Sequence, residues 1–150
     1  MITKLHIKNF KAHKNTVLDL ASLTFLCGHN GVGKSAVIQS LLLLRQTFQK
    51  NILYEGLDLN KPLCEIGTAQ DLFYQYAQDE FIEINLDFDD HKSYHWKFKF
   101  DETKANATFL DAAETGVKTR LNHRSIFNKK FQYLSAYSSA SGYSNYCGNA

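Results

Sequence analysis

The chain has 150 residues, of which 44% are hydrophobic and 21% are charged, and its formal net charge is +2 at pH 7. This length and composition are typical of one globular domain with a single hydrophobic core. Because the net charge is small, it gives no reason to expect nucleic acid or a membrane surface as the partner.

The first fifty residues contain strand patterns followed by a helix pattern. Residues 2–10 alternate as in a half-buried strand, and residues 17–20 predict a second, shorter strand. Residues 23–27 are apolar without alternation, which predicts a strand covered on both faces. From Lys34 to about Lys50 apolar residues recur at steps of three and four, which predicts a helix. Arg45 and Lys50 near its end suit the negative end of the helix dipole.

The remainder of the chain predicts a hairpin between less regular segments. Residues 52–78 are mixed and contain the only proline, so we expect short helices or loops and a turn at 60–62. Residues 82–88 and 94–100 alternate and are joined by a short polar segment, which predicts an antiparallel hairpin with acidic side chains opposite basic ones. Residues 107–110 and 131–134 are expected to add strands.

Residues 28–35, GHNGVGKS, lie between the apolar run and the predicted helix. They satisfy the G-x-x-x-x-G-K-[ST] pattern of a phosphate-binding P-loop, in the strand–loop–helix context that it requires. A polyphosphate needs many donors at short range, and backbone N–H groups supply them where side chains are absent. The alternative is a glycine-rich turn that only connects strand to helix, but such a turn needs one or two glycines, not three with a lysine and a serine in register.

This interpretation gives each residue of the loop a role. The residues expected to bind the phosphates are Gly28, His29, Asn30, Gly31, Val32, Gly33, Lys34 and Ser35. Lys34 is expected to contact the β- and γ-phosphates and so to be the catalytic residue, and Ser35 is expected to place its hydroxyl on Mg²⁺. Asn30 and Gly31 suit a tightly curled loop because both tolerate left-handed backbone.

The first 50 residues resemble the N-terminal lobe of ABC-type ATPases of the SMC, RecF and OLD group. In that group a strand, an Asn-Phe-Lys/Arg turn, a second strand and a Gly-x-Asn-Gly-x-Gly-Lys-Ser loop follow in this order. The segments EIGTAQDLFYQYAQ and FQYLSA are similar to segments of uncharacterised bacterial AAA-family ATPases related to OLD proteins.

The resemblance implies an α/β fold class, namely a P-loop NTPase N-terminal lobe with a mixed sheet around the P-loop helix and an antiparallel β-hairpin subdomain. It also implies that the cofactors are ATP and Mg²⁺, bound by residues 28–35. Lys11 holds the basic position of the Asn-Phe-Lys turn, so it is either a further phosphate contact or an ordinary solvated lysine.

Such ATPases complete their site with a Walker B strand and a signature helix. Residues 84–87, INLD, resemble a Walker B strand, but their alternation predicts a hairpin strand with one solvated face, and residues 134–136 lack the glycines of a signature. Nucleotide binding is therefore better supported than turnover. We interpret residues 1–135 as an incomplete P-loop ATPase N-terminal lobe and residues 136–150, which carry no charge, as a low-complexity tail that is disordered or frameshifted.

Function and partners follow from the resemblance. In its complete form such a protein hydrolyses ATP as a head-to-head homodimer, in DNA repair or anti-phage defence. The alternative is a non-catalytic nucleotide- or nucleic-acid-binding module that uses a basic stretch, made up of Lys118, Arg120, His123, Arg124, Lys129 and Lys130. The pattern favours a solvated face for this stretch, because aromatic residues are not interleaved with the cations. A phosphate-transferring kinase fits less well, since the Asn-Gly of the loop matches the ABC pattern.

Location and metal use are read from cysteine and histidine spacing. Cys27, Cys64 and Cys147 are odd in number and far apart, which favours reduced thiols and a cytoplasmic location. No set of cysteines and histidines has zinc spacing, so Mg²⁺ is the metal expected. The longest purely apolar run, 41–44, is too short to span a bilayer, so no membrane partner is expected.

Overall fold

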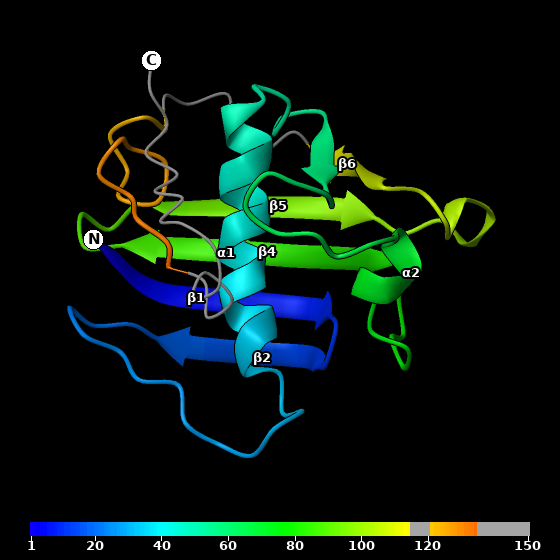
Figure 1. Ribbon diagram of the computed structural model, residues 1–150, viewed down its shortest axis with the longest axis horizontal. Coiled ribbons are helices and arrows are strands. Elements are labelled where there is room, and N and C mark those ends of the chain that lie inside the picture. Colours follow the sequence, from blue (N-terminus) through cyan, green and yellow to red (C-terminus); the bar gives the residue numbers. More distant parts are fainter. Residues whose placement is uncertain (115–120, 135–150) are drawn as a thin grey trace, which may run out of the picture.

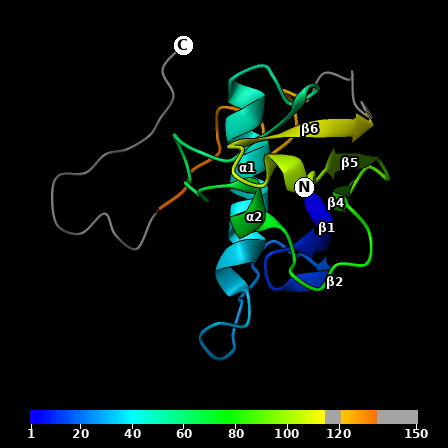
Figure 2. The same ribbon diagram turned by 90° about the vertical axis from the view of Figure 1, so that its right-hand side faces the viewer.

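The computed structural model describes residues 1–114 and 121–134, which form one antiparallel sheet with a long helix across one of its faces (Figures 1 and 2). The strands are β1 (Ile2–Phe10), β2 (His13–Asp19), β3 (Gly56–Asp58), β4 (Phe81–Phe88), β5 (Ser93–Lys99) and β6 (Phe109–Glu114). The helices are α1 (Lys34–Gln49), the one-turn α2 (Ala69–Leu72) and a short 3₁₀ turn, Glu102–Lys104. In the described residues, no helix combines the length and apolarity needed to cross a membrane.

The strands lie in the order β2-β1-β4-β5-β6-β3, and each neighbouring pair is antiparallel. The sequence predicted a mixed sheet and a separate hairpin subdomain, but the β4–β5 hairpin is the centre of the single sheet that the described residues form. The reason is a match between two alternating patterns. Leu5 pairs with Leu86 and Ile7 with Ile84, so β1 and β4 bury their apolar residues on the same face.

Helix α1 begins and ends close to where the sequence placed it, and it lies across the apolar face of the sheet (Figure 1). Leu43 and Leu44 are fully buried, and so are Leu5 and Ile7 of β1. The helix is also covered on its other side, because Arg45 donates to the backbone carbonyls of residues 126 and 128. Arg45 therefore ties the segment 121–131 to α1, and its role is not the dipole interaction expected from sequence alone.

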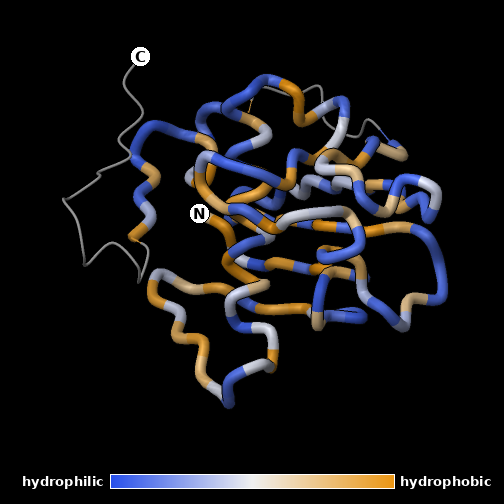
Figure 3. The backbone as a smooth tube through the Cα atoms, turned by 45° about the vertical axis from the view of Figure 1, so that its right-hand side comes forward, coloured by the Kyte–Doolittle hydropathy of each residue, from blue (hydrophilic) through white to orange (hydrophobic). Residues whose placement is uncertain are grey.

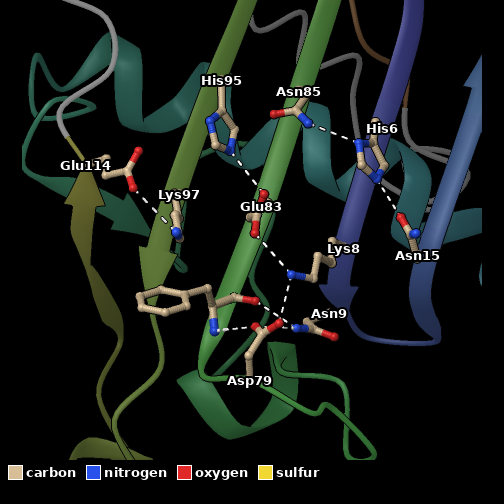
Figure 4. A network of polar contacts seen from close by, with 11 residues as sticks. His6, Lys8, Asn9, Asn15, Asp79, Glu83, Asn85, His95, Lys97 and Glu114 are labelled. Carbon is tan, nitrogen blue, oxygen red and sulfur yellow. Dashed lines mark hydrogen bonds and ion pairs between the residues drawn. The ribbon is translucent and has the colours of Figure 1, made fainter.

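The face of the sheet turned away from α1 is polar (Figure 4). Lys8 forms ion pairs with Asp79 and Glu83, at 2.8 and 3.2 Å, and Glu83 also contacts His95. Asn85 and Asp87 lie on this face, whereas Ile84 and Leu86 between and beside them are fully buried. The interpretation of residues 84–87 as a hairpin strand with one solvated face is confirmed, which places Asp87 on the far side of the sheet from α1.

The prediction of a covered strand at residues 23–27 is wrong. This segment has no strand partner among the described residues, and Leu23 and Phe25 are 71% and 78% exposed. Figure 3 shows its hydrophobic colouring in the loop that leaves β2 and returns to α1. Apolar composition indicates a preference for burial, but a strand forms only where a neighbouring backbone completes its hydrogen bonds.

Two expectations concern the end of the chain. Residues 131–134 do not form a strand, because Phe131 packs toward the core and Arg45 while the backbone that follows pairs with no neighbour among the described residues. The expected further strand at 107–110 is present as β6, shifted toward the C-terminus. The interpretation of residues 136–150 as a tail lies outside the described residues.

Candidate functional site

The segment 28–35 curls tightly before α1. Gly28, Gly31 and Gly33 have φ angles of +147°, +89° and +95°, which side chains on L-residues disfavour. Gly33 is the residue immediately before α1, and its carbonyl accepts the first helical hydrogen bond from the N–H of Val37 at 3.2 Å. The glycines therefore supply a backbone that can reverse direction at the head of the helix.

The start of α1 offers free backbone donors. No side chain caps the helix, and among the described residues no acceptor is found for the N–H groups of Lys34, Ser35 and Ala36. These N–H groups carry the positive end of the helix dipole. Together they form the kind of donor set that binds phosphate oxygens.

The side chain of Lys34 folds back over the loop. Its Nζ donates to the carbonyl of Gly28 at 2.7 Å and to the carbonyl of His29 at 2.6 Å. The ammonium group is thereby held against the curled backbone. Lys34 thus supplies both a positive charge and a free backbone donor from the first residue of α1.

A cavity of about 490 Å³ opens at this place, a volume within the range of roughly 300–1,000 Å³ for small-molecule sites. It is lined by Lys11, Ala12, Asn30, Gly31, Gly33, Lys34, Ser35, Ala36 and Gln39. The structure thus brings five of the eight predicted residues to one cavity. Gly28 and His29 contribute only carbonyls to Lys34, and the side chain of Val32 is exposed.

A larger cavity, of about 740 Å³, lies at the ends of β4 and β5. Its lining includes Asp79, Glu80, Asp101 and Glu102 with Lys99 as the single cation. Carboxylates repel phosphate groups, so this cavity does not suit a nucleotide. Among the described residues, the cavity at the head of α1 has the charge that a polyphosphate requires.

Lys11, in the turn between β1 and β2, lines the loop cavity. Its backbone is left-handed, with φ of +50°, and its N–H donates to the carbonyl of Leu72 at 2.6 Å. Burial lowers the pKa of the Lys11 ammonium, while the negative charge of Asp71 opposes this change. Burial also raises the pKa of the Cys64 thiol to about 12, so this neighbour is neutral. Lys11 is therefore a partly desolvated cation at the cavity and differs from an ordinary solvated lysine.

Residues 65–78, the segment that resembles OLD-related ATPases, contact the Asn-Phe-Lys turn at residues 9–11. Asp71 of α2 accepts hydrogen bonds from the N–H and hydroxyl of Thr68, both at 2.8 Å, which closes a capping box. The N–H of Tyr74 donates to the carbonyl of Asn9 at 3.0 Å. Helix α2 and the residues after it thus hold the Asn-Phe-Lys turn in place.

Sequence reasoning missed two polar residues near the loop. Gln39 lines the cavity, and buried His13 bonds to the carbonyl of Gly33 at 3.0 Å. In the sequence His13 reads only as a polar residue near a strand, since nothing local shows that its ring reaches a loop 20 residues away. Pairing of β1 with β2 brings it there.

The basic stretch does not form one solvated face. Arg124 is only 6% exposed, and it donates to Asp90 at 2.9 Å and to the hydroxyl of Tyr94 at 3.1 Å. Its guanidinium also lies 4.7 Å from the ring centroid of Phe88. The interpretation of Arg124 as solvated is wrong, because its planar group finds both an acid and aromatic rings to stack on.

The other cations of this stretch are distributed differently. His123, Lys129 and Lys130 are exposed, while Lys118 and Arg120 lie outside the described residues. With Arg124 bound to Asp90, the described part of the stretch offers three exposed basic residues, one of them a histidine.

Comparison with known proteins gives the family of the chain. The family model for the AAA ATPase domain matches residues 1–146. A search of curated proteins found no match. Members of this family bind nucleotide, generally ATP with Mg²⁺. Since the match spans nearly the whole sequence, the chain belongs to the AAA ATPase domain family.

Proposed function

We propose that the chain binds ATP with Mg²⁺ through residues 28–35. The observation that carries the proposal is that Lys34, Ser35 and Ala36, whose backbone N–H groups have no acceptor among the described residues, line one cavity at the head of α1. Lys34 also carries an ammonium group and Ser35 a hydroxyl. Neutral donors, one mobile cation and one hydroxyl are the donor set that a triphosphate with a hard cation requires. Family membership supports the choice of nucleotide.

Lys34, Ser35 and Lys11 have separate roles in this proposal. Lys34 exchanges its contacts with the Gly28 and His29 carbonyls for contacts with the β- and γ-phosphates, or adds to them. Ser35, which is exposed at the start of α1, offers its hydroxyl to Mg²⁺. When bound, the ion neutralises charge on the phosphates. Lys11, which lines the same cavity, supplies a second cation.

Hydrolysis is a further step of the proposal. Turnover needs a group that orients water and a second acid for the metal, and no carboxylate lines the loop cavity among the described residues. We therefore assign binding to this chain and hydrolysis to the complete ATPase, as a head-to-head homodimer acting in DNA repair or anti-phage defence. A non-catalytic nucleotide-binding module is the second candidate, and the missing carboxylate favours it.

Calorimetric titration tests which part of the ligand is recognised. Because the loop contacts phosphates, MgATP and magnesium tripolyphosphate are expected to bind, adenosine is not, and EDTA should weaken the binding of ATP. Phosphate release measured on the same samples separates binding from turnover. Adenosine binding as tightly as ATP, or no binding of ATP at all, contradicts the proposal.

Lys11 gives a separate prediction about reactivity. Because burial lowers its pKa, a larger fraction of Lys11 is neutral at pH 8 to 9, so acetic anhydride should acylate it faster than it acylates exposed Lys14 on the same hairpin. Bound phosphates favour the ammonium form and cover the cavity, so MgATP should slow the acylation of Lys11 but not of Lys14. Peptide mass spectrometry measures both rates. Unchanged Lys11 labelling in a sample saturated with MgATP rules out contact with the phosphates.

A further inference from the structure

His13 connects the sheet to the head of α1. It is the first residue of β2, where it pairs with Phe10 of β1, and its side chain is 8% exposed. Its Nε2 lies 3.0 Å from the carbonyl oxygen of Gly33, and its Nδ1 lies 2.9 Å from Oγ1 of Thr16. The ring therefore bridges a paired strand and the last residue before the helix.

The chemistry of the two partners fixes which nitrogen carries hydrogen. A carbonyl oxygen only accepts, so Nε2 must donate to Gly33. In the neutral ring Nδ1 then accepts from the hydroxyl of Thr16, and in the charged ring the same hydroxyl rotates and accepts instead. The donor to Gly33 is thus present in both charge states, and the ring is satisfied at both nitrogens.

Fixing the carbonyl of Gly33 also fixes a donor of the loop. The C=O of Gly33 and the N–H of Lys34 belong to the same planar trans peptide, so they point in opposite directions. The carbonyl already accepts from the N–H of Val37 at 3.2 Å, and the bond from His13 occupies its remaining lone pair. With both lone pairs in use, this peptide cannot rotate freely, and the N–H of Lys34 keeps its direction.

We infer that His13 is a positioning residue of the phosphate loop, which orients the Lys34 N–H toward the phosphate site before the nucleotide arrives. The inference rests on the proposed function, since it assumes that this N–H donates to a phosphate. A second observation supports it. A Cβ at Gly33 would lie 2.5 Å from Nε2 of His13, so the ring occupies the space that any side chain at this position would need.

Pre-orientation lowers the cost of binding because the donor is ordered in the free protein. The sheet fixes the position of His13. Strand β2, which contains His13, pairs with β1, and β1 pairs in turn with β4. By contrast, the loop itself is anchored mainly by the contacts of Lys34, which the ligand competes for. The bond from His13 does not involve any group assigned to the ligand.

Three variants test the role of the donor. His13→Gln keeps an N–H that reaches toward Gly33, whereas His13→Leu keeps bulk without a donor. His6→Leu is the matched control, since His6 lies on the opposite face and contacts Asn15 and Asn85. From the worth of one neutral hydrogen bond, His13→Leu should weaken MgATP binding roughly 3- to 10-fold. His13→Gln should stay within about 3-fold of the wild type, and His6→Leu should be unchanged.

Amide hydrogen exchange of the nucleotide-free protein gives an independent readout. Exchange at Val37, whose N–H donates to the carbonyl of Gly33, should accelerate in His13→Leu and not in His13→Gln, while the amides of Ile7 and Ile84 in the sheet stay protected in both. Equal weakening by Leu and Gln, wild-type affinity in His13→Leu, or loss of sheet protection along with loop protection each overturns the inference. If the wild type does not bind MgATP, the proposed function fails, and the exchange at Val37 still decides whether His13 orders the Gly33–Lys34 peptide.

Discussion

Replacing Lys34 with alanine is expected to weaken MgATP binding by at least about 10-fold while leaving the protein folded. Hydrogen bonds to charged groups contribute roughly 1.5–3 kcal/mol each, which corresponds to roughly 10- to 150-fold in affinity. In the free chain, among the described residues, the ammonium contacts only the carbonyls of Gly28 and His29 in an exposed loop, so its loss should change the free energy of unfolding little. Calorimetry measures the affinity, and thermal unfolding measures the stability.

Two further variants define what Lys34 supplies. Lys34→Arg keeps the positive charge but replaces a compact ammonium with a planar fork, so an intermediate affinity is expected in a narrow loop. Lys14→Ala removes an exposed lysine of β2 and is expected to bind MgATP as the wild type does. Binding by Lys34→Ala within twofold of the wild type means that the ammonium does not contact the phosphates, and the proposed site is then wrong.

The elements predicted from sequence are those whose signal is local. Strand β1, the β4–β5 hairpin and helix α1 each carry their own periodicity, so neighbouring residues were enough to place them. The joining of β1 to β4 was not visible, because Leu5 and Leu86 are far apart in the sequence and many strand pairs have matching alternation. The hairpin was therefore predicted as a subdomain, although it forms the middle of the sheet.

The residues of the candidate site also divide into those with a local sequence signal and those without one. The glycines, Lys34 and Ser35 were found because the motif is contiguous and the helix pattern begins beside it. The position of Lys11 depends on the left-handed backbone at Asn9 and Lys11 and on the contact with Leu72, none of which has a local signature. The apolar run at 23–27 misled the prediction, because composition alone does not show which backbone is available to pair with it.

Gly33→Ala is expected to be the most disruptive change in the loop that keeps the residue small. A residue held in a sparsely populated backbone region costs on the order of 1–3 kcal/mol, and Gly33 has φ of +95°. The new Cβ would also lie 2.5 Å from Nε2 of His13 and 3.3 Å from Cβ of Ala12, so the ring or the loop must move. Because the same peptide carries the N–H of Lys34, MgATP affinity should fall by at least about 10-fold, a change that calorimetry detects.

Gly31→Ala separates backbone strain from the collision. Gly31 has φ of +89°, close to that of Gly33, but a Cβ there would meet no atom within 4 Å. Gly33→Ala should therefore lower the free energy of unfolding more than Gly31→Ala does, and the difference measures the collision with His13. In the double variant Gly33→Ala/His13→Ala this excess should shrink, because the smaller side chain leaves room for the Cβ, so the two changes are non-additive. Equal costs for the two glycines, together with additive effects in the double variant, mean that the ring of His13 does not press on the loop in solution.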